Sequence, residues 1–361
     1  MIPVATGLSY GHANQALHAE IAVQRALAKT TLSQASSVLL FLTPECAREP
    51  KASIRSAARV AGCTQIVGCT GVGVLTEEEW VMDSPAAAAM VFGSEIHLAS
   101  GPGYPLSLCF ATGDHLSLDV LNSAPMFGMT TADTVDGVDF KVWSSSRIAE
   151  QGHVEVVIDG TIPAVGLSHS ILELGPPLRV SQARQHELVS LDGISALASL
   201  TECVQRYRTD RIGLTEDQLF FGILEEDRDD SDPVPFRLGH ILSTDIARQT
   251  VTLSSPVLPG ERLFWAILDP EAAERSTSTL IDSLHRKLRM DPSFGLLFPS
   301  VQRGPAFFGD RDRDVDLLAS RLPGLPFAGY YGRDQIAPAD GVNRICQYAA
   351  ALGLFAVPAS K

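Results

Sequence analysis

The sequence predicts an α/β protein with mixed sheets, flanking helices and two halves of related size packed together. Short apolar runs that end at glycine or proline alternate with helix-like segments along the chain. Hydrophobic residues make up 45% and charged residues 19% of the 361 residues, which is enough to build a core. Gly175-Pro176-Pro177 separates two parts that each mix strand and helix signals. We therefore expect one region over residues 1–175 and another over residues 176–361.

The first region begins with helix and strand signals in alternation. Residues 13–30 contain no glycine or proline and are rich in alanine, leucine and glutamine, which predicts a helix. The apolar run Ser37–Pro44 predicts a buried strand, and Arg48–Ala61 predicts a helix that ends at Gly62. The next strand is "QIVGC", so this part has a βαβ-like pattern.

The rest of the first region is expected to be mainly strands. "AAAAMVFG" and "IHLASG" read as two strands, and residues 114–122 as a helix. Asp159-Gly160 stands between alternating apolar residues, which predicts a β-hairpin.

The second region mixes hairpins and helices. "LRVSQARQHELVSLDG" predicts a hairpin before a helix over residues 195–207, and an acidic loop over 225–233 lies between further strands. Asp269 and Pro270 are suited to starting a helix as N-cap and first residue. We find no short-period repeat. The segment "FRLGHILSTDIARQTVTLSSPV" reads as strand, turn, strand, which is a further hairpin. The remaining predicted segments are the strands "LFFGIL", "ERLFWAIL", "FGLLFPSV", "PFAGYYG" and "RICQYAAALGLFAV", and the helix "DVDLLASRL".

Charge, apolar runs and cysteine spacing exclude several classes of protein. The net charge of −14 argues against nucleic-acid binding, which rests on clustered lysine and arginine. No apolar run reaches the roughly 18–20 residues that cross a bilayer, and the first residues do not read as a signal peptide. The six cysteines form no CxxC pair, so we expect reduced thiols in a cytoplasmic protein. No cofactor is expected.

The glycine turn "GCTGVG" follows the strand "QIVGC" and is the first candidate ligand site. Its glycine spacing matches neither a dinucleotide fingerprint nor a P-loop. Three interpretations stay open: tight turns only, a pocket lining formed by Gly68, Cys69, Thr70 and Gly71, or a catalytic thiol at Cys69. No histidine lies in a context that marks it as a catalytic partner, so we predict no catalytic residue.

The strand "FGLLFPSV" leads to the second candidate site, because Arg303 and Gly304 follow its end. The arginine fork suits a carboxylate or phosphate, and the glycine allows a ligand to approach the backbone. Asp310, Asp312 and Asp314 lack the glycine and glutamate of a calcium loop, so no metal site is expected. Asp314 is interpreted as the cap of the next helix.

A third candidate site is "PFAGYYGRDQIAP", in which Gly329 and Tyr331 belong to a short strand and Arg333 follows it. Tyrosine combines an apolar face with a hydroxyl, which suits a pocket wall or an interface. Phe307, Phe308 and the two tyrosines are also candidates for an exposed aromatic face on an interaction scaffold.

These segments together resemble the FIST family, which is built from a FIST N-terminal and a FIST C-terminal region. The resemblance covers nearly the whole chain and rests on the order and spacing of several segments. They are "VLLFLTPE", "GCTGVGVLTEEEW", "AAAAMVF", "GPPLRVSQARQHELVSLDGISAL", "PFRLGHILSTDIARQTVTLSSPVLPGERLFWAILDP", "LLFPSVQRG" and "PFAGYYGRDQIAP". Regions 1–175 and 176–361 would then be its N-terminal and C-terminal parts.

The resemblance implies a non-catalytic intracellular sensory module, a stand-alone bacterial-type member of the family. It would bind a small polar ligand, for which an amino acid or a small carboxylate is expected, and signal through a partner protein in trans. An enzyme using Cys69 and a protein-interaction scaffold are the alternatives. No nucleic-acid or membrane partner is expected.

The chain departs from the family pattern at four positions. The family has a Cys-Asn-Gly-Arg-Gly-like stretch where this chain has Ser300 before Arg303-Gly304, and it has glutamate where this chain has Gln335. By spacing, Cys346 and Ala349 replace a histidine and a threonine. A changed ligand or a lost site would follow from these departures.

Overall fold

Two compact units make up the chain in a computed structural model, which describes residues 4–12, 15–99, 105–113, 124–132, 134–135, 137–207, 218–225, 236–339 and 342–358. Unit 1 comprises Met1–His169 and Glu274–Lys361, and unit 2 comprises Ser170–Ala273. The mixed α/β class is confirmed. The compact units do not follow the predicted division after residue 175, because unit 1 combines strands from both sides of it; the two FIST regions stay a prediction.

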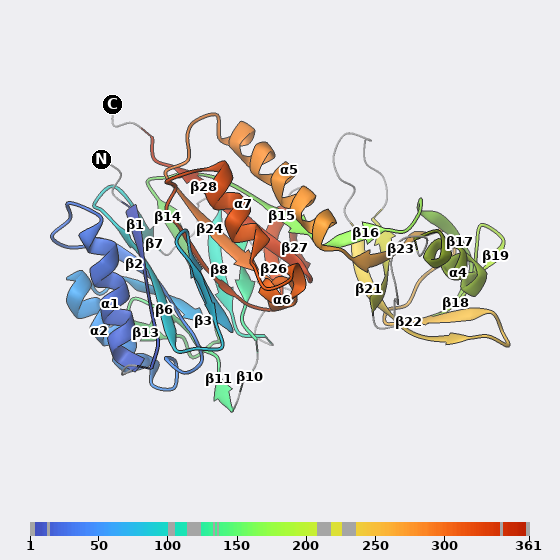
Figure 1. Cartoon of the computed structure of the whole chain (residues 1–361), viewed down its shortest axis with the longest axis horizontal. Helices are drawn as coiled ribbons and strands as arrows, with labels where there is room; N and C mark the ends of the chain where they lie inside the picture. The colour runs from blue at the N-terminus through green and yellow to red at the C-terminus, as the bar shows by residue number, and fades with distance from the viewer. Residues whose placement is uncertain are drawn as a thin grey trace. The chain divides into compact units, whose positions relative to one another are not determined.

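Among its described residues, unit 1 contains three six-stranded sheets, and its strands appear in Figure 1. The first sheet has the order β1 (Val4–Tyr10), β6 (Ala86–Phe92), β2 (Ser37–Leu42), β3 (Ile66–Thr70), β12 (Val142–Ser144), β13 (Arg147–Ile148). The second has β7 (His97–Ala99), β14 (His153–Asp159), β8 (Ser107–Ala111), β9 (Met126–Thr130), β26 (Gln335–Ala339), β27 (Val342–Cys346). The third has β15 (Ile162–His169), β28 (Ala349–Ala356), β24 (Phe294–Pro299), β25 (Phe327–Tyr331), β4 (Gly73–Thr76), β5 (Trp80–Met82). A separate ribbon pairs β10 (Thr134–Val135) with β11 (Val138–Asp139).

The three sheets are built on one plan, so unit 1 is a threefold structural repeat. Each sheet has a central parallel pair, which is β2–β3, β8–β9 or β24–β25. The hairpin that follows each pair joins another sheet: β4–β5 pairs with β25, β12–β13 with β3, and β26–β27 with β9. This cyclic exchange of hairpins ties the three repeats together.

A glycine occupies the third position of the second parallel strand in every repeat. Any side chain there would collide with the neighbouring strand, because the carbonyl oxygen opposite lies where the Cβ would be. The glycines are Gly68, Gly128 and Gly329, and their Cβ atoms would lie 1.8, 1.8 and 1.7 Å from the carbonyl oxygens of Leu40, Cys109 and Leu297.

The core of unit 1 centres on three phenylalanines from equivalent positions of the repeats. Phe41, Phe110 and Phe298 are fully buried and meet edge to face, with ring centroids 5.6, 6.1 and 5.8 Å apart. Edge-to-face packing is a preferred arrangement of aromatic rings. The repeats therefore share one hydrophobic core.

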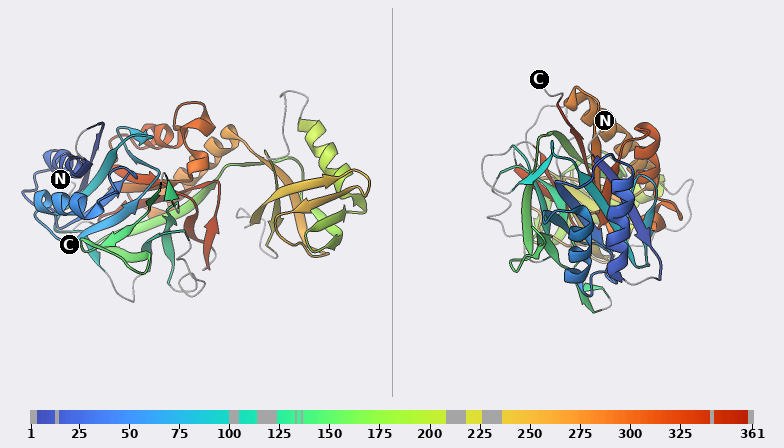
Figure 2. Two further views of the ribbon diagram at one scale, coloured as in Figure 1. Left: turned by 90° about the horizontal axis from the view of Figure 1, so that it is seen from below. Right: turned by 90° about the vertical axis from the view of Figure 1, so that its left-hand side faces the viewer.

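Helices cover the first and third sheets of unit 1. The first sheet is covered by α1 (Gln15–Ala28) and α2 (Pro50–Ala61), which lie side by side in the right-hand view of Figure 2. The third is covered by α5 (Pro270–Leu288) and α7 (Arg313–Arg321), whose buried side chains pack on β24 and β28. The predicted terminator Gly62 has φ 70°, and the Ala272 amide donates to Asp269 Oδ1 at 2.7 Å, as expected of the N-cap.

Unit 2 is a small sheet that closes on itself and carries one described helix, α4 (Ala196–Tyr207). Closure occurs because β20 pairs with both β21 and β23. The predicted hairpins β17–β18 and β21–β22 are confirmed. The strands are β16 (Ile171–Glu173), β17 (Leu178–Arg184), β18 (Glu187–Leu191), β19 (Ile194–Ser195), β20 (Leu219–Leu224), β21 (Phe236–Asp245), β22 (Thr250–Leu253) and β23 (Arg262–Leu268).

One predicted hairpin is wrong. Gly160 turns the chain with φ 85°, but β14 pairs with β7 and β8 whereas β15 pairs with β28. The turn connects two repeats instead of two paired strands. The helix expected over 114–122 and most of the acidic loop over 225–233 lie outside the described residues. None of the described helices is long and apolar enough to cross a membrane.

Candidate functional site

The glycine turn lies in the interior, where the chain passes from the first sheet to the third. Gly68, Cys69 and Thr70 are buried in β3. The Thr70 amide donates to the Lys141 carbonyl at 2.9 Å, and the Gly71 amide donates to the Leu42 carbonyl at 2.9 Å. These two amides are therefore bonded within the protein and do not face a ligand.

Cys69 has the surroundings of a structural thiol. Its side chain is fully buried in the shared core, and burial raises the pKa of the thiol well above its ordinary value. A hydrogen bond with Tyr330 offsets only part of this increase. A nucleophilic cysteine needs access and a lowered pKa. The structure therefore contradicts the alternative in which Cys69 is a catalytic nucleophile.

Arg303 binds an internal carboxylate, not an external anion. It is fully buried and donates to both oxygens of Asp314, from Nε at 2.7 Å and from Nη2 at 2.9 Å. Nη1 donates to the Ser168 carbonyl at 2.9 Å, and Nη2 reaches the Thr277 hydroxyl at 2.7 Å. We correct the expectation that this guanidinium faces a ligand. Gly304 is buried beside it as the N-cap of α6 (Pro305–Phe308).

Asp312, not Asp314, caps helix α7. Its Oδ1 accepts from the Val315 amide at 3.0 Å, and its Oδ2 accepts from the hydroxyl of Tyr331. Burial, followed by the nearby charge of Asp314, raises the pKa of Asp312 to about 7. Tyr331 is therefore a buried structural residue, as is Gly329 in the same strand.

The expected exposed aromatic face is not present. Tyr330 and Tyr331 are fully buried, and Phe308 is 4% exposed. The two tyrosine rings belong to two different core clusters, because β25 is covered on both faces. The interaction-scaffold alternative loses the surface on which it was based.

Polar side chains gather where the carboxyl ends of β9 and β25 meet. Thr130 ends β9, and its hydroxyl donates to Asp334 Oδ2 at 3.2 Å. Arg333 follows β25, and its Nε donates to the same oxygen at 2.8 Å while Nη2 donates to the Gly113 carbonyl at 3.2 Å. The Gln347 amide donates to Asp334 Oδ1 at 3.0 Å. We call Thr130, Arg333, Asp334 and Gln347 the strand-end cluster.

The four positions that depart from the family pattern lie beside this cluster. The Ser300 amide donates to the Ala349 carbonyl at 2.9 Å, and the Ala349 amide donates to Gln335 Oε1 at 3.3 Å. Gln335 pairs with Cys346 across β26 and β27. Ser300, Gln335, Cys346 and Ala349 are far apart in the sequence but lie close together in the second and third sheets.

The electrostatics of the cluster combine a recessed carboxylate with an accessible cation. The side chain of Asp334 is 9% exposed, whereas that of Arg333 is 33% exposed. Burial and then the charge of Asp334 raise the pKa of the nearby Tyr348 hydroxyl. The cluster brings a cation, an anion and neutral donors into one small area, where they are hydrogen-bonded to one another.

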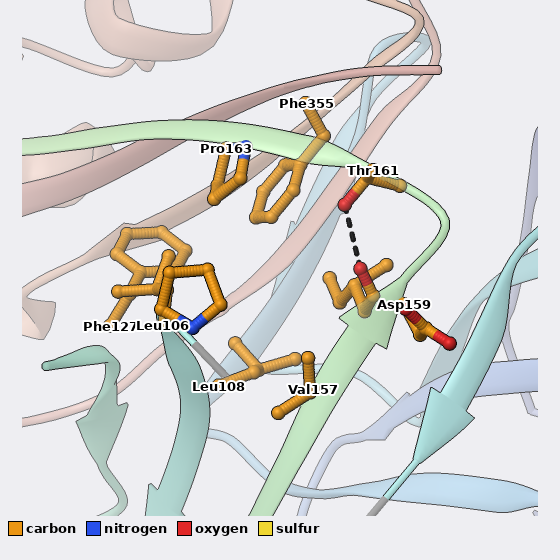
Figure 3. A pocket seen from close by; sticks show the side chains of 10 residues that line it. Leu106, Leu108, Phe127, Val157, Asp159, Thr161, Pro163 and Phe355 are labelled. Carbon is orange, nitrogen blue, oxygen red and sulfur yellow. Dashed lines mark hydrogen bonds between the residues drawn. The ribbon is translucent and has the colours of Figure 1, made fainter. Parts of the chain in front are cut away.

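An apolar cavity also lies in unit 1, and Figure 3 shows its lining. Leu108, Phe127 and Phe355 line it, and the Thr161 hydroxyl donates to the Ile158 carbonyl at its rim at 2.7 Å. Its volume is about 90 Å³. Ligand pockets commonly have roughly 300–1,000 Å³, so this cavity does not fit a polar metabolite.

Comparison with known proteins finds a family model that matches part of the chain. Residues 36–194 match the FIST N domain. FIST domains are sensory and signal-transduction domains, so the resemblance is confirmed for this part of the chain. The C-terminal FIST region expected over 176–361 stays a prediction.

Two mycobacterial proteins illustrate the relatives of this chain. Uncharacterized protein Rv0628c of Mycobacterium tuberculosis is 25% identical over 246 residues, which are 67% of this chain and 63% of that protein. Uncharacterized protein Mb0898c of Mycobacterium bovis is 23% identical over 243 residues, with the same coverage of 67% and 63%. The chain therefore matches less than two thirds of the length of these relatives, and their names give no ligand.

Among the predicted ligand-binding residues, Arg333 is the member that reaches the strand-end cluster. Sequence reasoning missed Thr130 and Gln347, which contact Asp334 from 204 and 13 residues away. A local signal for Thr130 exists: it lies two residues after Gly128, as Thr70 lies after Gly68. That similarity is visible only once the repeats are aligned by their structure.

Proposed function

We propose that this FIST protein is a non-catalytic cytoplasmic sensory module that binds an amino acid at the strand-end cluster. The observation that supports the proposal is the pair of opposite charges on Arg333 and Asp334, whose side chains are 33% and 9% exposed. An amino acid carries a carboxylate for the arginine fork and an ammonium group for the aspartate.

The position of the cluster supports the same proposal. Ligands of α/β proteins bind beyond the carboxyl ends of strands, and two parallel pairs end here: β8–β9 and β24–β25. The glutamate expected from the family is Gln335, which is buried and donates to Met129 Sδ at 3.0 Å. Asp334 would supply the negative charge that Gln335 lacks.

A cytoplasmic location is supported by the cysteines. All six are free thiols, and stable disulfides are a feature of oxidising compartments. A signalling partner acting in trans remains part of the proposal, since it would receive the change that the ligand causes.

The proposal is tested by a thermal-shift screen of the whole chain against amino acids, small carboxylates and nucleotides. A ligand at about 100 times its dissociation constant adds about 2.7 kcal/mol to the free energy of unfolding, which raises the midpoint by a few degrees. We expect an amino acid to raise the midpoint of the wild-type protein, and Arg333→Ala to lose that shift.

Arg311→Ala is the matched control, because Arg311 is an exposed arginine whose side chain is 79% accessible. It should keep the full shift. A screen without hits at millimolar concentration would contradict the proposal, as would a hit that Arg333→Ala and Asp334→Asn both retain.

A further inference from the structure

A broad groove lies where β2 leads into α2 and where β12 begins, on the first sheet. Its volume of about 810 Å³ lies within the range of roughly 300–1,000 Å³ typical of small-molecule sites. It shares no residue with the strand-end cluster. The lining residues are Ala47, Arg48, Glu49, Pro50, Lys51, Ala52, Arg55, Gly137, Val138, Asp139, Lys141 and Ile148.

The lining of this groove is basic on an acidic protein. Four cationic side chains face two carboxylates, so the lining has a net charge of +2, against −14 for the whole chain. Lys141 lies 3.6 Å from Asp139. Arg48, Lys51 and Arg55 are exposed and form no ion pair with any residue in the described part of the chain. Their charges are therefore available to a ligand.

The groove occupies the place in its repeat that the strand-end cluster occupies in another. The Thr70 amide donates to the Lys141 carbonyl at 2.9 Å, and the Thr130 amide donates to the Asp334 carbonyl at 2.9 Å. Lys141 and Asp334 are thus equivalent residues with opposite charges. The corresponding residue of the third sheet is the uncharged Gly73, which pairs with Tyr331.

We propose that this groove binds a small ligand through its phosphate group. It lies at the carboxyl ends of the parallel strands β2 and β3, the usual position of a ligand in an α/β sheet. Arg48 and Arg55 supply planar forks that match phosphate oxygens two at a time, and Lys51 and Lys141 add compact positive charge. Several cations without partners favour a multiply charged phosphate over a single carboxylate.

Pyrophosphate is the probe, titrated calorimetrically into the whole chain at low salt. We expect the wild-type protein to bind it and Arg48→Ala and Arg55→Ala each to weaken binding by roughly tenfold or more, because a hydrogen bond between charged groups is lost. Arg59→Ala is the matched control: Arg59 lies on the same helix, is exposed and pairs with Glu20 outside the groove. It should change the affinity by less than about twofold.

Two further experiments identify the kind of phosphate that binds and test whether this groove binds its ligand independently of the strand-end cluster. Vesicles of phosphatidylcholine containing phosphatidic acid test a lipid headgroup: sedimentation that requires Arg55 assigns the site to a lipid phosphate, and pyrophosphate binding without sedimentation assigns it to a free metabolite. Arg333→Ala should leave pyrophosphate binding unchanged even if amino-acid binding is lost.

The inference is overturned if the wild-type protein does not bind pyrophosphate. It is also overturned if succinate binds as tightly as pyrophosphate, or if Arg59→Ala weakens binding as much as Arg55→Ala. The thermal midpoint of each variant, measured without ligand, checks that these exposed substitutions leave the fold intact.

Discussion

Arg303 and Arg313 lie over the same ring, with their guanidinium carbons 6.0 and 5.9 Å from the centroid of Phe308. They differ in burial and in their carboxylate partners. Arg303 and Asp314 are fully buried, whereas Arg313 and Glu274 are 39% and 45% exposed at their side chains. The two arginines therefore have different roles. Arg303 forms an ion pair in the buried interior, whereas Arg313 forms one at the surface.

We predict that Arg303→Met lowers the free energy of unfolding by about 3–5 kcal/mol, because Asp314 is left buried without its partner. Arg313→Met should cost about 0–1 kcal/mol, since its pair is exposed. Urea denaturation measures both. The double variant Arg303→Met/Asp314→Leu should recover much of the loss, and a double variant no more stable than Arg303→Met would contradict this explanation.

At the scale of elements, the parallel pairs are held at a spacing that leaves no room for a side chain. Gly128 approaches the Cys109 carbonyl so closely that a Cβ would lie 1.8 Å from its oxygen. The same close contact between a glycine and the carbonyl oxygen opposite it occurs in each repeat, so it is a common feature of the three sheets. The glycines that first suggested a ligand site in "GCTGVG" are explained here by strand packing.

We predict that Gly128→Ala destabilises unit 1 by about 1–3 kcal/mol or more, because β8 and β9 must separate. Gly175→Ala is the control, since its Cβ would be 3.4 Å from Cys203 Sγ, an ordinary contact. It should change the free energy of unfolding by less than about 0.5 kcal/mol. Chemical denaturation of both variants decides the matter, and equal stabilities would be incompatible with the close approach described.

Local sequence signals predicted the helices and strands well, but they predicted poorly which strands pair with one another. The end of α2 at Gly62 and the start of α5 at Asp269 depend on capping chemistry within a few residues, so sequence reasoning located them. The turn at Asp159-Gly160 was also local, but the sheets that its two strands join are set by residues elsewhere in the chain. Arg333 was found from its position after a strand; its neighbour Thr130 could not be, because hairpin exchange brings the two together.

At the scale of the whole molecule, unit 2 is an insertion within the third repeat. The chain leaves at Ser170 and returns at Asp269, whose amide donates to the Ser170 carbonyl at 2.8 Å. The residues next to these, Ile171 and Leu268, are paired across β16 and β23. Entry and exit are therefore adjacent, the condition under which a domain can be inserted or removed.

We predict that replacing residues 171–268 by a short Gly-Ser linker leaves unit 1 folded. Circular dichroism should show a cooperative thermal transition for the excised protein. Replacing residues 73–82 by the same linker should abolish that transition, because β4 and β5 complete the third sheet. An unfolded product from the first excision would show that unit 1 depends on unit 2.

The exchange of hairpins has a consequence for synthesis on the ribosome. Strand β4 ends at Thr76, but its partner β25 spans Phe327–Tyr331. At roughly 5–20 residues per second, the roughly 250 residues between them take on the order of 10–50 s to translate. Throughout that interval the edge of β4 that faces away from β5 presents unpaired backbone groups, so we expect the nascent chain to depend on chaperones until its last repeat emerges.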